Sequence, residues 1–364
     1  MSELACGIVG LPNVGKSTLF NALTRAGAAS SNYPFCTIDP NVGVVDVQDS
    51  RLGVLSNISG SEKLIYASMR FVDIAGLVKG ASQGEGLGNQ FLAHIRETDA
   101  IVHVVRCFES EDIIHVEGRV HPIDDIETIN LELILSDLQT VQNILGRIEK
   151  QAKGKKELQP MLELLVKVQG HLDKSLPVRT LELSKEEQAL LKTYPLLTQK
   201  KVLYAANVSE DDLPMMENQY VQQVREYATR EGNLVIPICG KLEAEVAELP
   251  EEEQQEFLES VGLQETGLNR LIRTAFHMLG LITYLTTGEK ETRAWTIHQD
   301  MTAPEAAGKI HTDIQKGFIR AEVATYEDMV KYQGKAGARE AGKLRSEGKD
   351  YIVQDGDVIE FLHN

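Results

Sequence analysis

One short run of residues near the N-terminus constrains the fold of this chain more than any other feature of its sequence. Residues 10–17, GLPNVGKS, fit the pattern G-x-x-x-x-G-K-[ST]. They directly follow an apolar stretch at 4–9 and open a helical pattern at 17–25. Glycines allow the backbone to curl there, so that its N–H groups point inward around phosphate groups. The run predicts a phosphate-binding loop between a strand and a helix, and a plain glycine-rich turn is the less favoured alternative.

Three separately spaced features follow one another in the order typical of nucleotide switches. Lys16 would reach the β- and γ-phosphates, and the Ser17 hydroxyl would ligate Mg²⁺. Asp73 ends an apolar stretch and begins a D-x-x-G pattern, so it would hold Mg²⁺ through water while the Gly76 amide meets the γ-phosphate. Thr37 lies between the first expected helix and the second expected strand, where a switch threonine would complete the Mg²⁺ shell.

Short β-branched stretches alternate with helix-length segments over much of the chain, which favours an α/β fold with a mainly parallel sheet. One interruption carries heptad-spaced apolar residues in two successive stretches and predicts an antiparallel coiled-coil hairpin. Beyond residue 280 the pattern becomes β-rich, which indicates a small α+β domain. We predict a nucleotide-binding domain at 1–126 and 199–280, a helical insertion at 127–198 and a C-terminal domain at 281–364. The heptad positions are Ile134, Leu138, Val141, Leu145 and Ile148, then Leu158, Met161, Leu165, Val168 and Leu172.

The charge balance limits the surfaces that could meet nucleic acid. The chain has 37 Lys and Arg against 54 Asp and Glu, a net charge of −17, so any contact with RNA must come from local basic clusters. One cluster lies in the turn of the expected hairpin and one in the C-terminal domain. Each fits a solvated surface as well as a contact with RNA or a ribosome. The clusters consist of Arg147, Lys150, Lys153, Lys155 and Lys156, and of Lys331, Lys335, Arg339, Lys343, Arg345 and Lys349.

The sequence indicates a cytoplasmic protein without membrane contact. No apolar run approaches the ~20 residues that a membrane-spanning helix needs, and the first residues lack the pattern of a signal peptide. Cys6, Cys36, Cys107 and Cys239 are far apart and form no C-x-x-C pair, which is typical of reduced thiols.

The segment expected to read the nucleotide base departs from the pattern of GTPases. GTPases carry N-K-x-D, whose Asp accepts hydrogen bonds from guanine, whereas this chain has Asn207, Val208, Ser209 and Glu210. The longer Glu210 cannot keep the same bidentate geometry. Backbone groups beside Val208 could read adenine, and Asn207 could reach its N7 or N6 atom. We therefore expect ATP to be preferred, with GTP as a weaker ligand.

Taken together, the motifs resemble the YchF/Obg-like ATPase family of Obg-related P-loop NTPases. The resemblance implies an OBG-type G domain interrupted by a helical hairpin and followed by a TGS domain, a ubiquitin-like β-grasp module. It also implies ATP hydrolysis and association with ribosomes or RNA. The resemblance rests on residues 10–24, 32–41, 71–92 and 207–210, and it continues through 293–297, 306–322 and 348–361.

The same resemblance assigns roles to individual residues. Asn13 is similar to its counterpart in K⁺-dependent members of the class, so K⁺ is a second candidate cation. The implied Mg²⁺ ligands are Ser17 and Thr37, and the implied base contacts are Asn207 and Val208. The implied phosphate contacts are Asn13, Val14, Gly15, Lys16, Ser17 and Thr18.

The group that would orient the attacking water is not evident from the sequence. Many relatives place a Gln directly after D-x-x-G, whereas Leu77 stands there in this chain and cannot orient water. His115, in a loop after the expected strand at 101–105, is a catalytic candidate, and His94 is a second. Because most histidines carry out no chemistry, a structural role is the favoured interpretation of both.

Three functions remain open at this point. The favoured one is a slow ATPase switch whose nucleotide state controls a partner-binding surface. A GTPase acting in translation is the second. An RNA- or ribosome-binding adaptor with a mainly structural nucleotide site is the third, and the intact set of Lys16, Ser17, Thr37 and Asp73 argues against it.

Overall fold

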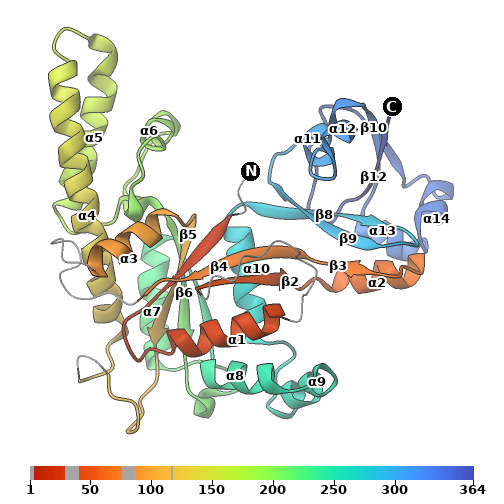
Figure 1. The fold of residues 1–364 in the computed structure, drawn as a ribbon, viewed down its shortest axis with the longest axis horizontal. Coiled ribbons are helices and arrows are strands. Elements are labelled where there is room, and N and C mark those ends of the chain that lie inside the picture. Colours follow the sequence, from red (N-terminus) through yellow and green to blue (C-terminus); the bar gives the residue numbers. More distant parts are fainter. Residues whose placement is uncertain (1–3, 29–40, 76–86, 116–117) are drawn as a thin grey trace. The chain divides into compact units, whose positions relative to one another are not determined.

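The chain folds into two compact units and contains two sheets (Figure 1). A computed structural model describes residues 4–28, 41–75, 87–115 and 118–364. The first unit comprises Met1–Gly43 and Arg70–Leu271, and the second comprises Val44–Met69 and Ile272–Asn364. The second unit thus takes in an early segment besides the predicted C-terminal domain at 281–364. The division into three domains made from the sequence remains a prediction.

The first sheet has six strands in the order β2-β4-β1-β5-β6-β7. β1 pairs in parallel with β4 and β5, and β6 pairs in parallel with β5 and β7, so the predicted parallel α/β sheet is confirmed. Every residue of β5 is buried, as expected for a central strand that is covered on both faces. The strands are β1 (Ala5–Val9), β2 (Val42–Val47), β4 (Ala67–Asp73), β5 (Ala100–Arg106), β6 (Lys201–Asn207) and β7 (Leu234–Ile238). The helices are α1 (Lys16–Ala28), α3 (Leu87–Arg96), α7 (Gln219–Glu231), α8 (Gly240–Glu248), α9 (Glu251–Ser260) and α10 (Gly267–Met278).

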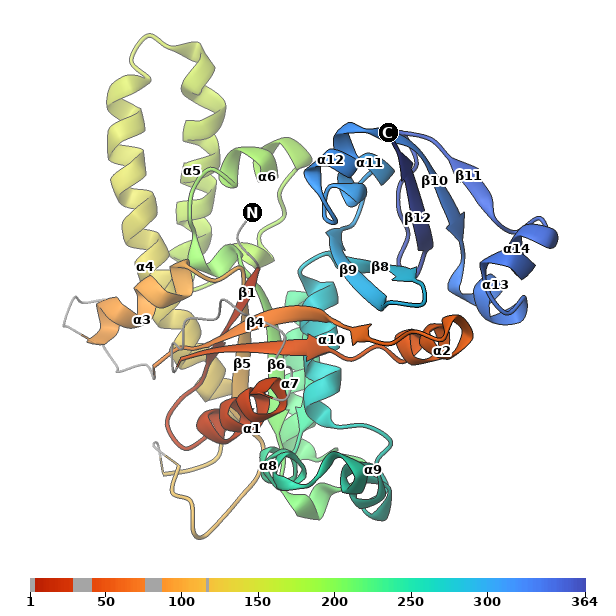
Figure 2. The ribbon, with the colours of Figure 1, turned by 45° about the vertical axis from the view of Figure 1, so that its right-hand side comes forward.

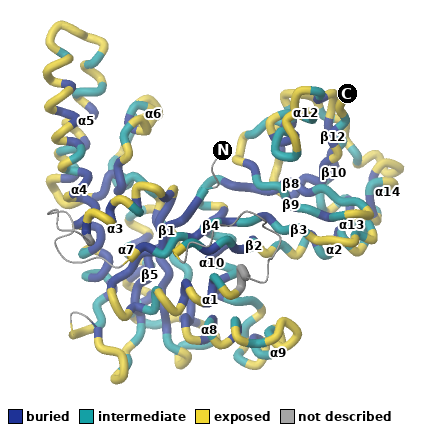
Figure 3. The backbone as a smooth tube through the Cα atoms, in the orientation of Figure 1, coloured by how far each residue is buried: buried dark blue, intermediate teal, exposed yellow. Residues whose placement is uncertain are grey.

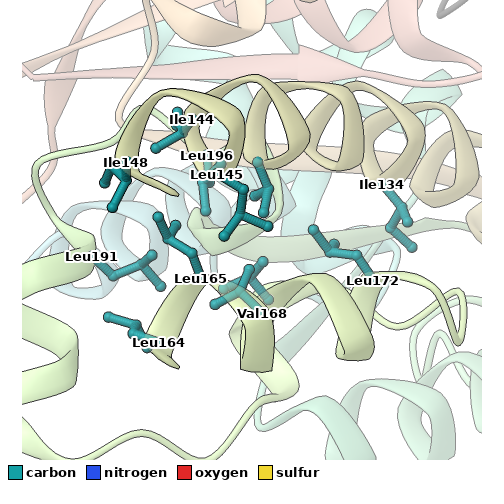
Figure 4. Close-up of a cluster of buried hydrophobic side chains, with 12 residues drawn as sticks. Ile134, Ile144, Leu145, Ile148, Leu164, Leu165, Val168, Leu172, Leu191 and Leu196 are labelled. Atoms are coloured by element: carbon teal, nitrogen blue, oxygen red, sulfur yellow. The ribbon is translucent and has the colours of Figure 1, made fainter. Parts of the chain in front are cut away.

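The predicted helical hairpin is formed by α4 (Pro122–Gln151) and α5 (Gln159–Leu172), which lie side by side in Figures 1 and 2. Figure 4 shows the apolar side chains of the two helices facing one another, with Leu145, Leu165 and Val168 among them. Asp137 joins the hairpin to the following segment, because its carboxylate accepts hydrogen bonds from the backbone N–H groups of Leu197 and Thr198. The segment between α5 and β6 contains η3 (Val178–Thr180), α6 (Lys185–Leu191) and η4 (Leu197–Gln199), and η2 (Lys156–Leu158) precedes α5.

The second sheet also has six strands, in the order β11-β10-β12-β8-β9-β3. β8 pairs antiparallel with β9 and parallel with β12, while β3, from the early segment, pairs in parallel with β9. The strands are β3 (Leu64–Ile65), β8 (Leu281–Thr287), β9 (Thr292–His298), β10 (Phe318–Ala324), β11 (Arg345–Glu347) and β12 (Val358–His363). The helices of this unit are α2 (Ser50–Ser59), α11 (Ala303–Ala307), α12 (Thr312–Lys316), α13 (Tyr326–Lys331) and α14 (Lys335–Glu340). A further short helix, η5 (Glu210–Asp212), belongs to the first unit. Among the helices of the described residues, none combines the length and the apolar character needed to cross a membrane.

Candidate functional site

The glycine-rich loop lies between β1 and α1, as predicted, and lines a cavity of about 790 Å³ in the first unit. Residues 10–13 and 15–18 form one side of this cavity, whereas the side chain of Val14 is buried and does not line it. The Lys16 ammonium group forms an ion pair with the carboxylate of Asp73 at the end of β4. Both side chains are largely buried, at 12% and 22% exposure. The two charged groups that the sequence assigned to phosphate and Mg²⁺ therefore meet at the loop.

Gly15 is required in this loop for two independent reasons. Its φ of +97° lies in the left-handed region, which residues with a Cβ rarely adopt. A Cβ at this position would also lie 2.1 Å from Nδ2 of Asn207. The close approach allows the side chain of Asn207 to reach the backbone of the loop.

Asn207 connects the phosphate-binding loop to the beginning of α8. Its Nδ2 atom donates a hydrogen bond of 2.9 Å to the carbonyl oxygen of Val14, and its Oδ1 atom accepts one of 2.9 Å from the N–H of Gly240. The residue is only 5% exposed. An amide NH₂ group has two donors, and the bond to Val14 uses one of them. The contact of Asn207 with a purine therefore stays a prediction. The observed role is to hold the loop.

Val208 and Glu210, which were considered for base recognition, both interact with other residues of the chain. The N–H of Val208 donates a 2.8 Å hydrogen bond to the carbonyl oxygen of Ile238, and the side chain of Val208 is buried. An N–H that reads adenine would therefore have to come from another residue. The carboxylate of Glu210 lies 2.5 Å from Nζ of Lys241, which draws it into an ion pair.

The other side of the cavity consists of residues that the sequence analysis did not identify. Phe108 and Ile113 line it from the segment after β5, and Gly240 and Lys241 line it from the segment after β7. Both segments follow the carboxyl ends of parallel strands, where ligands bind in open α/β sheets. That rule was the one sequence signal that could have pointed to them.

His115 belongs to a buried pair and does not line the cavity, which supports the structural interpretation over the catalytic one. Its Nε2 atom lies 2.9 Å from Oδ2 of Asp125 in the first turn of α4, and both side chains are 2% exposed. His94 lies in the last turn of α3 and is partly exposed.

The residues present near the loop fit a magnesium ion. Mg²⁺ prefers hard oxygen ligands and commonly keeps several waters and substrate phosphates in its shell. Asp73 supplies a carboxylate beside the loop, and the Ser17 hydroxyl is exposed at the first turn of α1. No group of three or more His, Cys, Asp or Glu that could hold a metal occurs in the described part of the chain. Thr37, Gly76 and Leu77 lie outside the described residues.

The two basic clusters differ in the structure. In the C-terminal cluster, Lys335 and Arg339 both pair with Glu322, at 2.7 Å and 3.1 Å, and Arg345 pairs with Glu347. These ion pairs neutralise part of the excess positive charge that was counted from the sequence. All five cations of the hairpin turn are exposed, and Figure 3 shows this turn coloured as exposed.

The comparisons with known proteins agree with this site. A family model for 50S ribosome-binding GTPases matches residues 5–147, and the C-terminal YchF-GTPase model, described as a protein of unknown function (DUF933), matches residues 281–364. The ribosome-binding ATPase YchF of Escherichia coli O157:H7 is 56% identical over 360 residues, with 99% of each chain covered. The chain belongs to the YchF family. The YchF protein of Bacillus subtilis (strain 168) is also 56% identical, over 363 residues and 99% of each chain.

Solved structures support the fold of this YchF family member. The structure of the Schizosaccharomyces pombe YchF GTPase covers 100% of this chain and 98% of its own, with 38% identity and a TM-score of 0.88. A GTP binding protein from Pyrococcus horikoshii OT3 has 20% identity and a TM-score of 0.61, with 99% and 100% covered, which demonstrates a shared fold alone. The predicted P-loop NTPase fold class and the resemblance to the YchF family are both confirmed.

Proposed function

We propose that this chain is a Mg²⁺-dependent P-loop nucleotide hydrolase that prefers ATP to GTP and acts as a switch on the ribosome. The observation that carries this proposal is the meeting of Lys16, Asp73 and Asn207 at one phosphate-binding loop. Three sequence-distant polar groups at one loop argue for a nucleotide site that acts, rather than for a structural remnant. The printed names of the E. coli and B. subtilis relatives, ribosome-binding ATPases, support the same function.

The residues of the chain would divide the work of phosphoryl transfer between them. The backbone N–H groups of the loop and the Lys16 ammonium would hold and orient the β- and γ-phosphates. Ser17 and, in this proposal, Thr37 would ligate Mg²⁺ and Asp73 would hold it through water; the ion neutralises charge on the phosphate oxygens when bound. Gly76 would meet the γ-phosphate. K⁺ at Asn13 is the second cation that we propose.

The preference for ATP is supported by the surroundings of Glu210. Guanine recognition needs a carboxylate that accepts two hydrogen bonds from the base. Glu210 is one methylene longer than the aspartate of the GTPase pattern and cannot keep that bidentate geometry, and its carboxylate is paired with the exposed Lys241. The apolar and buried Val208 replaces the lysine of the GTPase pattern. A site without the guanine acceptor loses its main discrimination in favour of GTP.

Association with the ribosome is proposed to use the turn of the helical hairpin. Its exposed cations are Arg147, Lys150, Lys153, Lys155 and Lys156, and no ion pair to them is seen within the described ranges. Positive charge at the end of a hairpin could meet RNA phosphates, whereas the net charge of −17 repels RNA elsewhere. The protein would then act in the cytoplasm, where ribosomes are.

The decisive experiment compares nucleotides by titration calorimetry with Mg²⁺ present and follows phosphate release. We expect ATP to bind more tightly than GTP and to be hydrolysed slowly. Lys16→Ala should weaken ATP binding by at least about 100-fold, because the lost charge contacts phosphate. Lys192→Ala, at an exposed lysine of the insertion, is the control and should bind as the wild type does. Tighter binding of GTP would contradict the base preference, and absence of binding by both nucleotides would contradict the function.

A further inference from the structure

Arg106 is a buried cation immediately behind the wall of the nucleotide cavity. It is the last residue of β5, lies opposite Asn207 in the register with β6, and is 1% exposed. Its Nε atom donates a 3.1 Å hydrogen bond to the carbonyl oxygen of Phe108, and Nη2 donates one of 2.8 Å to that of Ile113. The guanidinium carbon also lies 4.7 Å from the centre of the Phe108 ring. The single side chain thus holds both residues that form the apolar wall.

Further contacts hold the segment at 107–115, which contains Phe108 and Ile113. The Asp125 carboxylate, which acts electrostatically on Arg106, also pairs with His115. On the side of the phosphate-binding loop, Nδ2 of Asn13 donates a 3.1 Å hydrogen bond to the carbonyl oxygen of Ile114. Residues 107–115 form neither helix nor strand, so they are held by contacts of this kind, together with a 2.8 Å hydrogen bond from the N–H of Cys107 to the carbonyl oxygen of Asn207.

We propose that Arg106 is a positioning residue that holds Phe108 and Ile113 as the wall against which the nucleotide base packs. This inference rests on the proposed nucleotide function. Arg106 acts through Phe108 and Ile113 and does not itself line the cavity. A wall that is ordered before binding lowers the entropic cost of ordering it around the ligand. The planar fork of a guanidinium can reach two carbonyl groups at once, which the single ammonium of lysine does less well.

The test separates the base from the phosphates by using two ligands with Mg²⁺, ATP and inorganic tripolyphosphate. We expect Arg106→Met to weaken ATP binding about tenfold and tripolyphosphate binding less than about twofold, with Arg106→Lys between wild type and Arg106→Met. Arg179→Met is the matched control, because Arg179 is also buried in the first unit, pairs with Glu231 and does not line the cavity. This control should leave both affinities unchanged.

Equal weakening of both ligands by Arg106→Met, or unchanged ATP affinity, would overturn the proposal, as would an equal effect of Arg179→Met. If Arg106→Met does not fold, a double-mutant cycle of Arg106→Lys with Phe108→Ala decides the matter. Non-additive losses of ATP affinity are expected, and additive losses would refute an action through Phe108. Wild-type protein that binds neither ligand would instead contradict the nucleotide function itself.

Discussion

Nδ2 of Asn207 donates a 2.9 Å hydrogen bond to the carbonyl oxygen of Val14, which ties the end of β6 to the phosphate-binding loop. The same carboxamide accepts from the N–H of Gly240, so one side chain joins two segments that line the cavity. Because both contacts are buried, the position of the loop depends on a residue that lies 193 positions after Val14 in the sequence.

Asn207→Ala should weaken the binding of ATP and of inorganic tripolyphosphate alike, by about tenfold or more, because it releases the loop that holds the phosphates. The unfolding free energy should fall by about 2–4 kcal/mol, since two buried backbone groups lose their partners. Both changes can be measured by titration calorimetry and chemical denaturation. Asn130→Ala is the matched control, because Asn130 is also 5% exposed and hydrogen-bonded, to Tyr227, but does not line the cavity. Normal tripolyphosphate affinity in Asn207→Ala would contradict the scaffolding role.

Gly15→Ala should abolish nucleotide binding, because the new Cβ would have to displace Asn207 from the loop. Gly232→Ala is the control for backbone strain alone. Gly232 has a φ of +70° at the end of α7, and a Cβ there would meet nothing within 4 Å. Gly232→Ala should lower the free energy of unfolding by about 1–2 kcal/mol and leave the affinity for ATP unchanged. The idea fails if both variants bind ATP equally well, as measured by titration calorimetry.

Glu243→Gln should change stability in a pH-dependent manner. Burial raises the pKa of Glu243 to about 7, against hydrogen bonds from the N–H groups of Gly267 and Leu268 that favour the charged form. A raised carboxyl pKa means that the native state binds the extra proton, so its contribution is most favourable below about pH 4.5 and is lost as the pH rises to about 7. The glutamine variant does not titrate. It should match the wild type near pH 5 and be more stable by about 1–3 kcal/mol near pH 8.

Denaturant titrations at the two pH values test this prediction. Glu256→Gln, at an exposed position of α9, supplies the baseline for an ordinary Glu-to-Gln change. A stability difference for Glu243→Gln that is the same at both pH values would show that Glu243 does not titrate in this range.

Reversing the charge of the hairpin turn should weaken ribosome binding. In the triple variant Lys153→Glu, Lys155→Glu and Lys156→Glu, we expect weaker binding to purified ribosomes and a smaller dependence on salt. The slope of log K against log salt should decrease by about two to three, because fewer counterions are released from RNA. The control triple variant, with Lys174, Lys185 and Lys192 changed to Glu, alters the net charge equally at exposed sites elsewhere in the insertion. Equal loss in both variants would exclude a specific role for the turn.

The parts of this protein that could be predicted from its sequence are those that local sequence patterns determine. The phosphate-binding loop is recognisable because its function depends on contiguous backbone geometry, from Gly10 to Ser17. The helical hairpin is recognisable because a heptad repeat buries one stripe of each helix, as Leu145 and Val168 demonstrate. In both cases, residues close in sequence determine the local structure. In the hairpin, the two helices then pair through their apolar stripes.

Tertiary structure alone decided which distant residues meet. The sequence does not indicate that Leu64 pairs with Thr292 in the second sheet. It places Phe108 and Ile113 after the carboxyl end of a strand, but not together as the wall of the cavity. It also does not indicate that Glu322 neutralises Lys335. These contacts join residues whose separation along the chain is unrelated to any helix or strand period, so no local pattern records them. The motif residues therefore define the chemistry of this YchF family member, and the packing of its distant segments defines the site in which that chemistry takes place.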